Sequence, residues 1–276
     1  MSWLYDIPTI TLAGLFSIVF VGLTWLGIVF VKPFLRLLLR HQPGLNDLVG
    51  YVLASHCAFF GLLLGLLAVA AYQNYSEVDK TANREAGLLR SIYRSIIDYP
   101  EPLRSDTLPL IREYTRYIVE DAWPQQRRGI ISRDGIERMN AIQEKLFAFE
   151  PTTKAQEVVH FHTMEQYFAM AEVRRARIQN VDAGVPYIMW YVVGIGLLIT
   201  MILIWMLDMR LVPHLLLGGL LTFFLSTVIC LIVAMDKPLR GEIGIGPEAY
   251  KAVLDRMIVR PQGTLGELPS GVRTQP

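Results

Sequence analysis

The chain has 276 residues, of which 53% are hydrophobic and only 18% charged, and its formal net charge is +1. This composition excludes an ordinary soluble domain, and the near-neutral charge gives no reason to expect nucleic acid as a partner. The hydrophobic residues gather in four stretches with few or no charges, at about 9–31, 48–72, 185–207 and 211–235. Each stretch can cross roughly 30 Å of hydrocarbon as a helix. We therefore predict an all-α integral membrane protein with four transmembrane helices, embedded in the lipid bilayer.

Four crossings place the N-terminus, the long segment between the second and third spans, and the C-terminus on the same side of the membrane. The Lys and Arg residues near the span ends are divided too evenly to decide which side is cytosolic. We expect a multi-pass protein of the cell (inner) membrane. Its predicted parts are a first transmembrane pair (1–72), an extramembrane bundle (73–184), a second transmembrane pair (185–235), and an interfacial turn with a short helix and a disordered tail (236–276).

The segment between the second and third spans is predicted to be helical, because its apolar residues recur three and four positions apart. The first helix of this segment continues the second span without a break and ends at Tyr99, before Pro100 and Pro102. Its apolar stripe consists of Val78, Ala82, Ala86, Leu89, Tyr93 and Ile96.

Three more helices are expected to complete an antiparallel bundle. The next helix is predicted to begin near Ser105 or Asp106 and to end at Trp123-Pro124. A short helix follows, and its expected buried face is Ile136, Met139, Ile142, Leu146 and Phe149. The last begins with a capping box formed by Thr153 and Gln156. Its expected buried stripe is Val159, Phe161, Met164, Phe168, Ala171 and Ile178. After the fourth span, Gly246-Pro247 should begin a short helix that buries Tyr250, Val253, Leu254 and Met257.

Few polar residues lie inside the predicted spans. His56 is the best intramembrane candidate for an ion pathway, because an ionisable side chain in hydrocarbon is costly unless it is paired or hydrated. A neutral histidine that bonds to a neighbouring helix is the alternative. Gly61 and Gly65 form a G-x-x-x-G spacing that permits close helix packing, within the chain or with another subunit.

Charged residues also gather at the span ends. Asp236, Lys237 and Arg240 follow the fourth span and could line the mouth of an ion pathway, or simply terminate the helix with Pro238. A basic cluster before the third span is placed to contact lipid headgroups or attract anions; it consists of Arg174, Arg175 and Arg177.

The sequence offers no support for an enzyme or a cofactor. Glu157 and His160 have the spacing of a di-iron ligand pair, but the chain has no second copy of that pair, so we predict no metal site. A phosphate-binding glycine loop, a CxxC pair and a supported catalytic triad are also absent from the sequence.

Several short segments resemble the bestrophin-like domain family of bacterial membrane proteins, which are mostly of unknown function. They are Asn46-Asp47-Leu48-Val49-Gly50, Arg84-Glu85-Ala86, Glu120-Asp121-Ala122-Trp123-Pro124, Arg174-Arg175-Ala176-Arg177 and Asp236-Lys237-Pro238-Leu239-Arg240-Gly241. Leu239 departs from the Phe that is usual in the family. Bestrophins themselves are pentameric anion channels, so the resemblance implies an oligomer and raises the possibility of a channel.

These observations leave two functional hypotheses. The first is an oligomeric ion channel, with inorganic ions as its partners and a pore formed between subunits of a homo-oligomer. The second is a non-conducting, membrane-anchored sensor or scaffold whose helical bundle binds a partner.

Overall fold

The computed structural model describes residues 8–39, 44–179 and 184–259, and all regular structure in these ranges is helical. Contacts divide the chain into two compact units. The membrane unit comprises Met1–Asp79 and Gln179–Ile245, and the bundle unit comprises Lys80–Ile178 and Gly246–Pro276. The expected disorder of the C-terminal tail lies outside the described residues.

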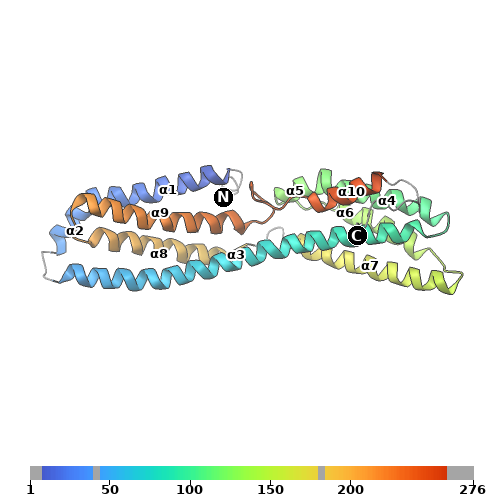
Figure 1. Ribbon diagram of the computed structural model, residues 1–276, viewed down its shortest axis with the longest axis horizontal. Helices are drawn as coiled ribbons and strands as arrows, with labels where there is room; N and C mark the ends of the chain where they lie inside the picture. Colours follow the sequence, from blue (N-terminus) through green and yellow to red (C-terminus); the bar gives the residue numbers. More distant parts are fainter. Residues whose placement is uncertain (1–7, 40–43, 180–183, 260–276) are drawn as a thin grey trace, which may run out of the picture. The chain divides into compact units, whose positions relative to one another are not determined.

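Four helices in the described ranges are long and apolar enough to cross a membrane, as predicted. The first span combines α1 (Thr9–Leu26), a π-helical turn η2 (Gly27–Val31) and the start of α2 (Lys32–Leu39). The second lies in α3 (Leu45–Ile97), and the others are α8 (Tyr187–Met206) and α9 (Leu211–Asp236). Within the membrane unit, α1, α8, α9 and the first part of α3 run side by side (Figure 1).

The interior of the membrane unit is apolar and includes side chains from all four spans, among them Leu12, Leu64, Val193 and Ile229. Polar bonds between helices supplement this packing, as expected where lipid offers no hydrophobic driving force for helix association. Trp25 donates to the Leu215 carbonyl at 3.0 Å and so joins α1 to α9. Trp205 donates to the Thr24 carbonyl at 3.1 Å and joins α8 to α1.

Glycine allows an aromatic ring to reach the backbone at the contact between α3 and α8. A β-carbon added at Gly196 would lie 2.5 Å from the Phe60 ring, whereas one added at Gly194 would meet no atom within 4 Å. The two helices therefore approach closely at Gly196 because its side chain is missing.

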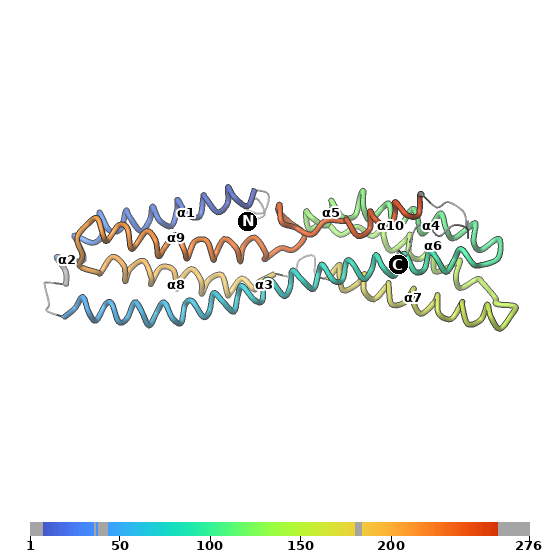
Figure 2. The backbone as a smooth tube through the Cα atoms, in the orientation of Figure 1, coloured from blue at the N-terminus to red at the C-terminus, as the bar shows by residue number. Residues whose placement is uncertain are grey.

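The helix that continues the second span is unbroken, as predicted. Helix α3 has 53 residues and runs from the membrane unit into the bundle unit, as its continuous trace in Figure 2 shows. It ends at Ile97, two residues before the predicted end at Tyr99. All six residues of its predicted stripe are buried, from Val78 to Ile96.

The other helices of the bundle unit are α4 (Leu103–Tyr117), a π-helical turn η3 (Ile118–Ala122), α5 (Trp123–Arg127), α6 (Asp134–Phe147), α7 (Lys154–Gln179) and α10 (Glu248–Val259). Helix α4 packs against α6 and α10. Helix α10 buries Tyr250, Val253, Leu254 and Met257, as predicted.

Two predictions about α4 and its continuation were wrong. The helix begins at Leu103, ahead of Ser105 and Asp106, and the Glu101 carboxylate accepts the Ser105 backbone N–H at 3.0 Å. Pro124 does not end the helix, because the wider turn of η3 precedes it and α5 continues to Arg127. A proline lacks the N–H of a regular helical bond, and a local change of winding accommodates it.

The predicted buried face of α7 was also wrong. Val159, Phe161 and Phe168 are exposed. Helix α7 instead buries Thr163, Tyr167, Met170, Val173 and Arg177. Tyr167 can be buried because its hydroxyl donates to the Met139 carbonyl at 2.9 Å, so a polar group on this face has a partner. Half of the predicted capping box is present, since the Thr153 hydroxyl accepts the Gln156 backbone N–H at 3.2 Å, whereas the Gln156 side chain accepts from Thr152 and not from Thr153. On α6 the prediction is largely confirmed, because Met139, Ile142 and Leu146 are buried and only Ile136 at the start of the helix is exposed among its helical members.

The glycine contact predicts a position-specific effect on stability. Gly196→Ala should destabilise the protein by about 1–3 kcal/mol, because the added methyl group overpacks the contact with Phe60. Gly194→Ala is the matched control on the same helix and should be neutral or slightly stabilising, because alanine favours helix more than glycine does. Thermal unfolding of both variants in detergent measures the difference, and equal effects would contradict the close contact of α3 and α8.

Candidate functional site

His56, the predicted intramembrane candidate, contacts α8 within the same chain. Its Nε2 lies 3.0 Å from the Gly196 carbonyl oxygen and 3.0 Å from the Thr200 hydroxyl, and its ring stacks on Phe60. These contacts match the alternative of a histidine bonded to a neighbouring helix. A role in ion permeation stays a prediction.

A second polar group joins the spans near the hairpin between α8 and α9. Lys32 donates to the Met209 carbonyl at 2.7 Å and lies 3.0 Å from Nδ1 of the buried His214. Nε2 of His214 faces the Ile204 carbonyl at 2.9 Å, so Nε2 carries the proton and Nδ1 accepts from Lys32. Asp208 lies 4.0 Å from Lys32, which places the hairpin charges in contacts with the end of the first span.

The segment from Asp236 to Gly241 ends α9 and holds the start of the third span. The Asp236 side chain is buried and its Oδ1 accepts the Val185 backbone N–H at 2.5 Å. Gly241 has a positive φ of 78°, which glycine adopts at little cost. Lys237 and Arg240 are half-buried. Asp236 therefore joins the end of α9 to the segment just before α8, and an ion-path role for the three charged residues stays a prediction.

Gly61 and Gly65 face away from the other helices of the chain. Both are exposed, and a β-carbon added at either would meet no atom within 4 Å. The predicted close packing therefore does not occur within the described part of this chain, and a contact with another subunit stays a prediction.

The bundle unit contains a buried ion pair that the sequence did not predict. Nε of Arg177, on α7, donates to Oε2 of Glu85, on α3, at 2.6 Å. Both side chains are excluded from solvent, with 1% of Arg177 and 0% of Glu85 exposed. The prediction that Arg177 contacts lipid was therefore wrong, because its guanidinium faces the interior of the bundle. Arg175 is exposed and Arg174 half-buried, so contact with lipid or anions stays a prediction for those two.

Further polar groups complete the surroundings of this pair. Tyr250 of α10 donates to Glu85 at 3.0 Å, and Tyr114 of α4 donates to its other oxygen at 3.4 Å. Gln126 of α5 accepts a hydrogen bond from Arg177. The Arg177 guanidinium also lies over the Trp123 ring, 5.2 Å from its centroid. We call these six residues the Glu85–Arg177 cluster: Glu85, Tyr114, Trp123, Gln126, Arg177 and Tyr250.

The electrostatics of the cluster keep its tyrosines neutral and its arginine charged. Burial raises the pKa of Tyr114 and Tyr250 well above the ordinary value, and the Glu85 carboxylate raises it further. Burial lowers the pKa of Arg177, but the attraction and hydrogen bond of Glu85, together with the neighbouring Tyr250 and Tyr114, outweigh this, so the pKa lies above its ordinary value. The tyrosines therefore act as hydrogen-bond donors to Glu85 at any physiological pH.

Sequence signals for the cluster existed. Glu85 lies three residues after Ala82 and four before Leu89, so it falls on the apolar face of α3 and needs a buried partner there. Glu85, Trp123 and Arg177 each belong to a different segment that carries the family resemblance, and the fold brings the three together. The contributions of Gln126, Tyr114 and Tyr250 depend on how α4, α5 and α10 pack, which periodicity does not give.

The Glu85–Arg177 cluster can hold five helices together, but its residues do not form a recognisable catalytic group. Within the described residues, no three His, Cys, Asp or Glu side chains are grouped to hold a metal ion. The role supported by the geometry is to fix the positions of α3, α7 and α10 relative to one another.

Removing one partner of the pair should be far more harmful than removing a nearby surface charge. Arg177→Met leaves Glu85 buried and unpaired, and we expect a loss of about 3–5 kcal/mol. Arg175→Met, two residues away and exposed, should change stability by less than about 0.5 kcal/mol. The double variant Glu85→Leu with Arg177→Met should recover part of the loss. Chemical unfolding monitored by tryptophan fluorescence measures these variants and the single variant Glu85→Leu, and strict additivity of Glu85→Leu and Arg177→Met in the double variant would contradict the pairing.

The buried tyrosines predict a loss of stability at alkaline pH. Their folded-state pKa is raised, so their contribution is fully present below the ordinary tyrosine pKa of about 10 and is lost as pH rises above it. Unfolding and the phenolate absorbance of these residues should therefore appear together. The variant with both Tyr114→Phe and Tyr250→Phe should show a shallower decline of stability with pH. A phenolate signal from Tyr114 and Tyr250 in the folded protein near pH 10 would contradict their burial.

Comparison with known proteins identifies the family. A family model described as the Bestrophin-like domain matches residues 18–250. A crystal structure described as that of a membrane protein has a TM-score of 0.63, with 11% sequence identity over 91% of this chain and 99% of that chain. This likeness shows a shared fold. No curated protein matches the chain. The family model covers most of the sequence, and the chain belongs to the bestrophin-like domain family.

Proposed function

We propose that the protein is a homo-oligomeric ion channel whose pathway runs between subunits. The observation that carries this proposal is an open face of small residues on α3. Ala54, Ala58, Gly61 and Gly65 are all exposed, and their spacing places them on one side of the helix. Small residues allow helices to approach closely in lipid, so this face fits another subunit.

The packing inside the membrane unit supports a pathway between subunits over one through a single subunit. Apolar side chains from all four spans fill the space between the helices. The buried polar groups Thr24, Thr200 and Thr222 donate to carbonyls one turn earlier in their own helices. Ions need a hydrated or polar route, and the described part of one chain has its polar groups engaged in helix contacts. The family name is consistent with conduction but does not by itself establish it.

The alternative is a non-conducting sensor or scaffold. The feature that favours it is α3, which runs without interruption from the membrane unit into the bundle unit and carries Glu85 of the buried cluster. A continuous helix can transmit a change in its packing along its length. This alternative needs a partner for the bundle and does not need a closed ring of subunits.

The two functions differ in what a change to the open face of α3 would do. In a channel, Gly61→Leu with Gly65→Leu should break the oligomer and abolish conductance, because bulky side chains prevent close approach of the helices. Gly14→Leu is the matched control, since Gly14 is also exposed and meets no atom within 4 Å, but lies on α1. Light scattering after size-exclusion chromatography gives the subunit number, and planar-bilayer recording in a KCl gradient gives conductance and ion selectivity.

Discrete openings from the wild type, lost in the α3 variant and kept in the α1 control, are the expected result. An oligomer that stays silent across voltage and pH would reject the channel and favour the scaffold. An oligomer unaffected by both changes on α3 would reject the proposed subunit contact.

A further inference from the structure

A groove in the bundle unit lies between α3 and α10, separate from the Glu85–Arg177 cluster. It has a volume of about 550 Å³, and its lining comes from both helices: Arg90, Tyr93, Arg94 and Ile97 of α3, and Val253, Asp255, Arg256 and Met257 of α10. Small-molecule sites usually have volumes of about 300–1,000 Å³. The groove is therefore large enough for a small organic ligand.

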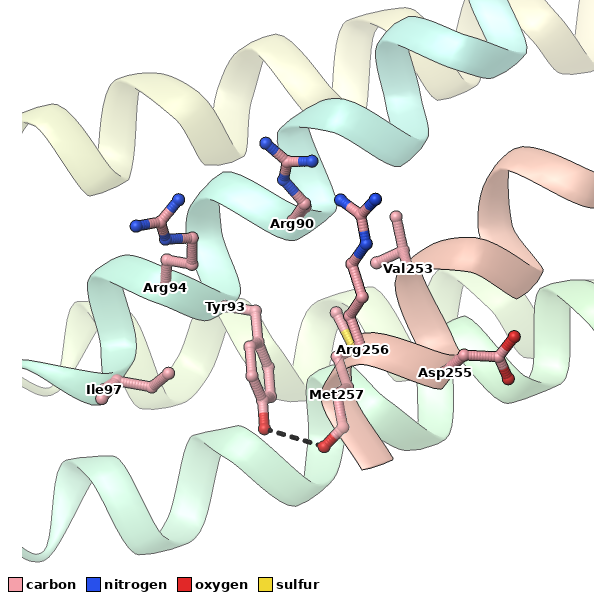
Figure 3. A pocket seen from close by; sticks show the side chains of 8 residues that line it. All are labelled: Arg90, Tyr93, Arg94, Ile97, Val253, Asp255, Arg256 and Met257. Carbon is pink, nitrogen blue, oxygen red and sulfur yellow. Dashed lines mark hydrogen bonds between the residues drawn. The ribbon is translucent and has the colours of Figure 1, made fainter. Parts of the chain in front are cut away.

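The charges that line the groove are mainly positive. Arg90 and Arg94 come from α3 and Arg256 from α10, and all three are exposed. In Figure 3 their guanidinium groups extend to the same side of the groove, whereas the carboxylate of Asp255 extends away from them. No ion pair within the described residues involves any of the three. Three guanidinium groups that converge on one groove repel one another, and an anion would relieve this repulsion.

The remainder of the lining is apolar or aromatic and is held in place. Tyr93 donates to the Met257 carbonyl at 3.4 Å, as Figure 3 shows, and Ile97 and Val253 flank them. Arg112 of α4 donates to the Tyr93 hydroxyl at 2.9 Å and to the Met257 carbonyl at 3.3 Å. The floor of the groove is therefore fixed by hydrogen bonds, while its arginines have no protein partner in the described structure.

We propose that this groove binds a phosphate-bearing anion with an apolar or aromatic portion. The guanidinium fork matches phosphate oxygens with two parallel hydrogen bonds, and it is the usual choice where phosphate is recognised. The apolar portion would lie against Tyr93, Ile97 and Met257. The phosphate comes either from a soluble compound such as a nucleotide or from a lipid headgroup. Bound between Arg94 and Arg256, such a ligand joins α10 to α3. This site is independent of whether the protein conducts ions.

The experiment uses the full chain in nanodiscs of phosphatidylcholine. Thermal unfolding is measured with added ATP or pyrophosphate, and separately in nanodiscs that contain phosphatidylglycerol. The variants are Arg94→Gln and Arg256→Gln, and the matched control is Arg84→Gln, an exposed arginine on α3 that does not line the groove. Titration of the shift gives an apparent affinity for each variant.

We expect one of these probes to stabilise the wild type and the control equally. The affinity should fall about tenfold or more in each groove variant, because each loses a charged hydrogen-bond donor. An effect of ATP or pyrophosphate in phosphatidylcholine identifies a soluble ligand, and an effect of phosphatidylglycerol alone identifies a lipid headgroup. The proposal is overturned if no probe shifts the unfolding of the wild type, or if a shift is the same in the groove variants and the control.

Discussion

The bundle unit depends on keeping one charge pair out of water. Moving Glu85 and Arg177 into the interior costs several kcal/mol for each ion, and their mutual attraction offsets this only when their remaining hydrogen-bonding positions are filled. Tyr114 and Tyr250 fill those of Glu85, and Gln126 accepts from Arg177. Because these side chains come from five different helices, any other packing of the helices would leave a buried charge unsatisfied.

This constraint gives α10 a definite role. The helix follows the last transmembrane span in the chain and contributes Tyr250 to the cluster and Arg256 to the groove. Both features join α10 to α3, which supplies the buried Glu85 to the cluster and the exposed Arg94 to the groove. In the proposed channel, a ligand in the groove and the buried pair would act on the same contact between α3 and α10.

The sequence predicted the parts of the fold that depend on periodicity and length. The four spans, the unbroken α3 and the buried face of α10 follow from apolar spacing, and the structure confirms them. The predicted buried face of α7 was wrong because we assumed that its apolar side chains would be the buried ones. Tyr167 and Arg177 are buried there through specific partners on other helices, and Phe161 and Phe168 are exposed.

The residues of the candidate site were also predictable only in part. Glu85 on the apolar stripe of α3 signals a buried charge, but its partner lies 92 positions away and no local pattern connects the two. The contacts of His56 with Gly196 and Thr200 likewise depend on how α3 and α8 pack. Patterns along one helix show which face is buried, whereas a polar site needs the relative positions of several helices.

Amide hydrogen exchange of α10 tests most directly whether the buried pair holds the bundle unit together. Helices that unfold as one cooperative unit share a common opening free energy. We predict that residues 248–259 exchange at the same slow rate as residues 80–97 of α3 in the wild type, and that both become faster together in Arg177→Met. Rapid exchange of α10 in the wild type, as for a detached peptide, would contradict the account.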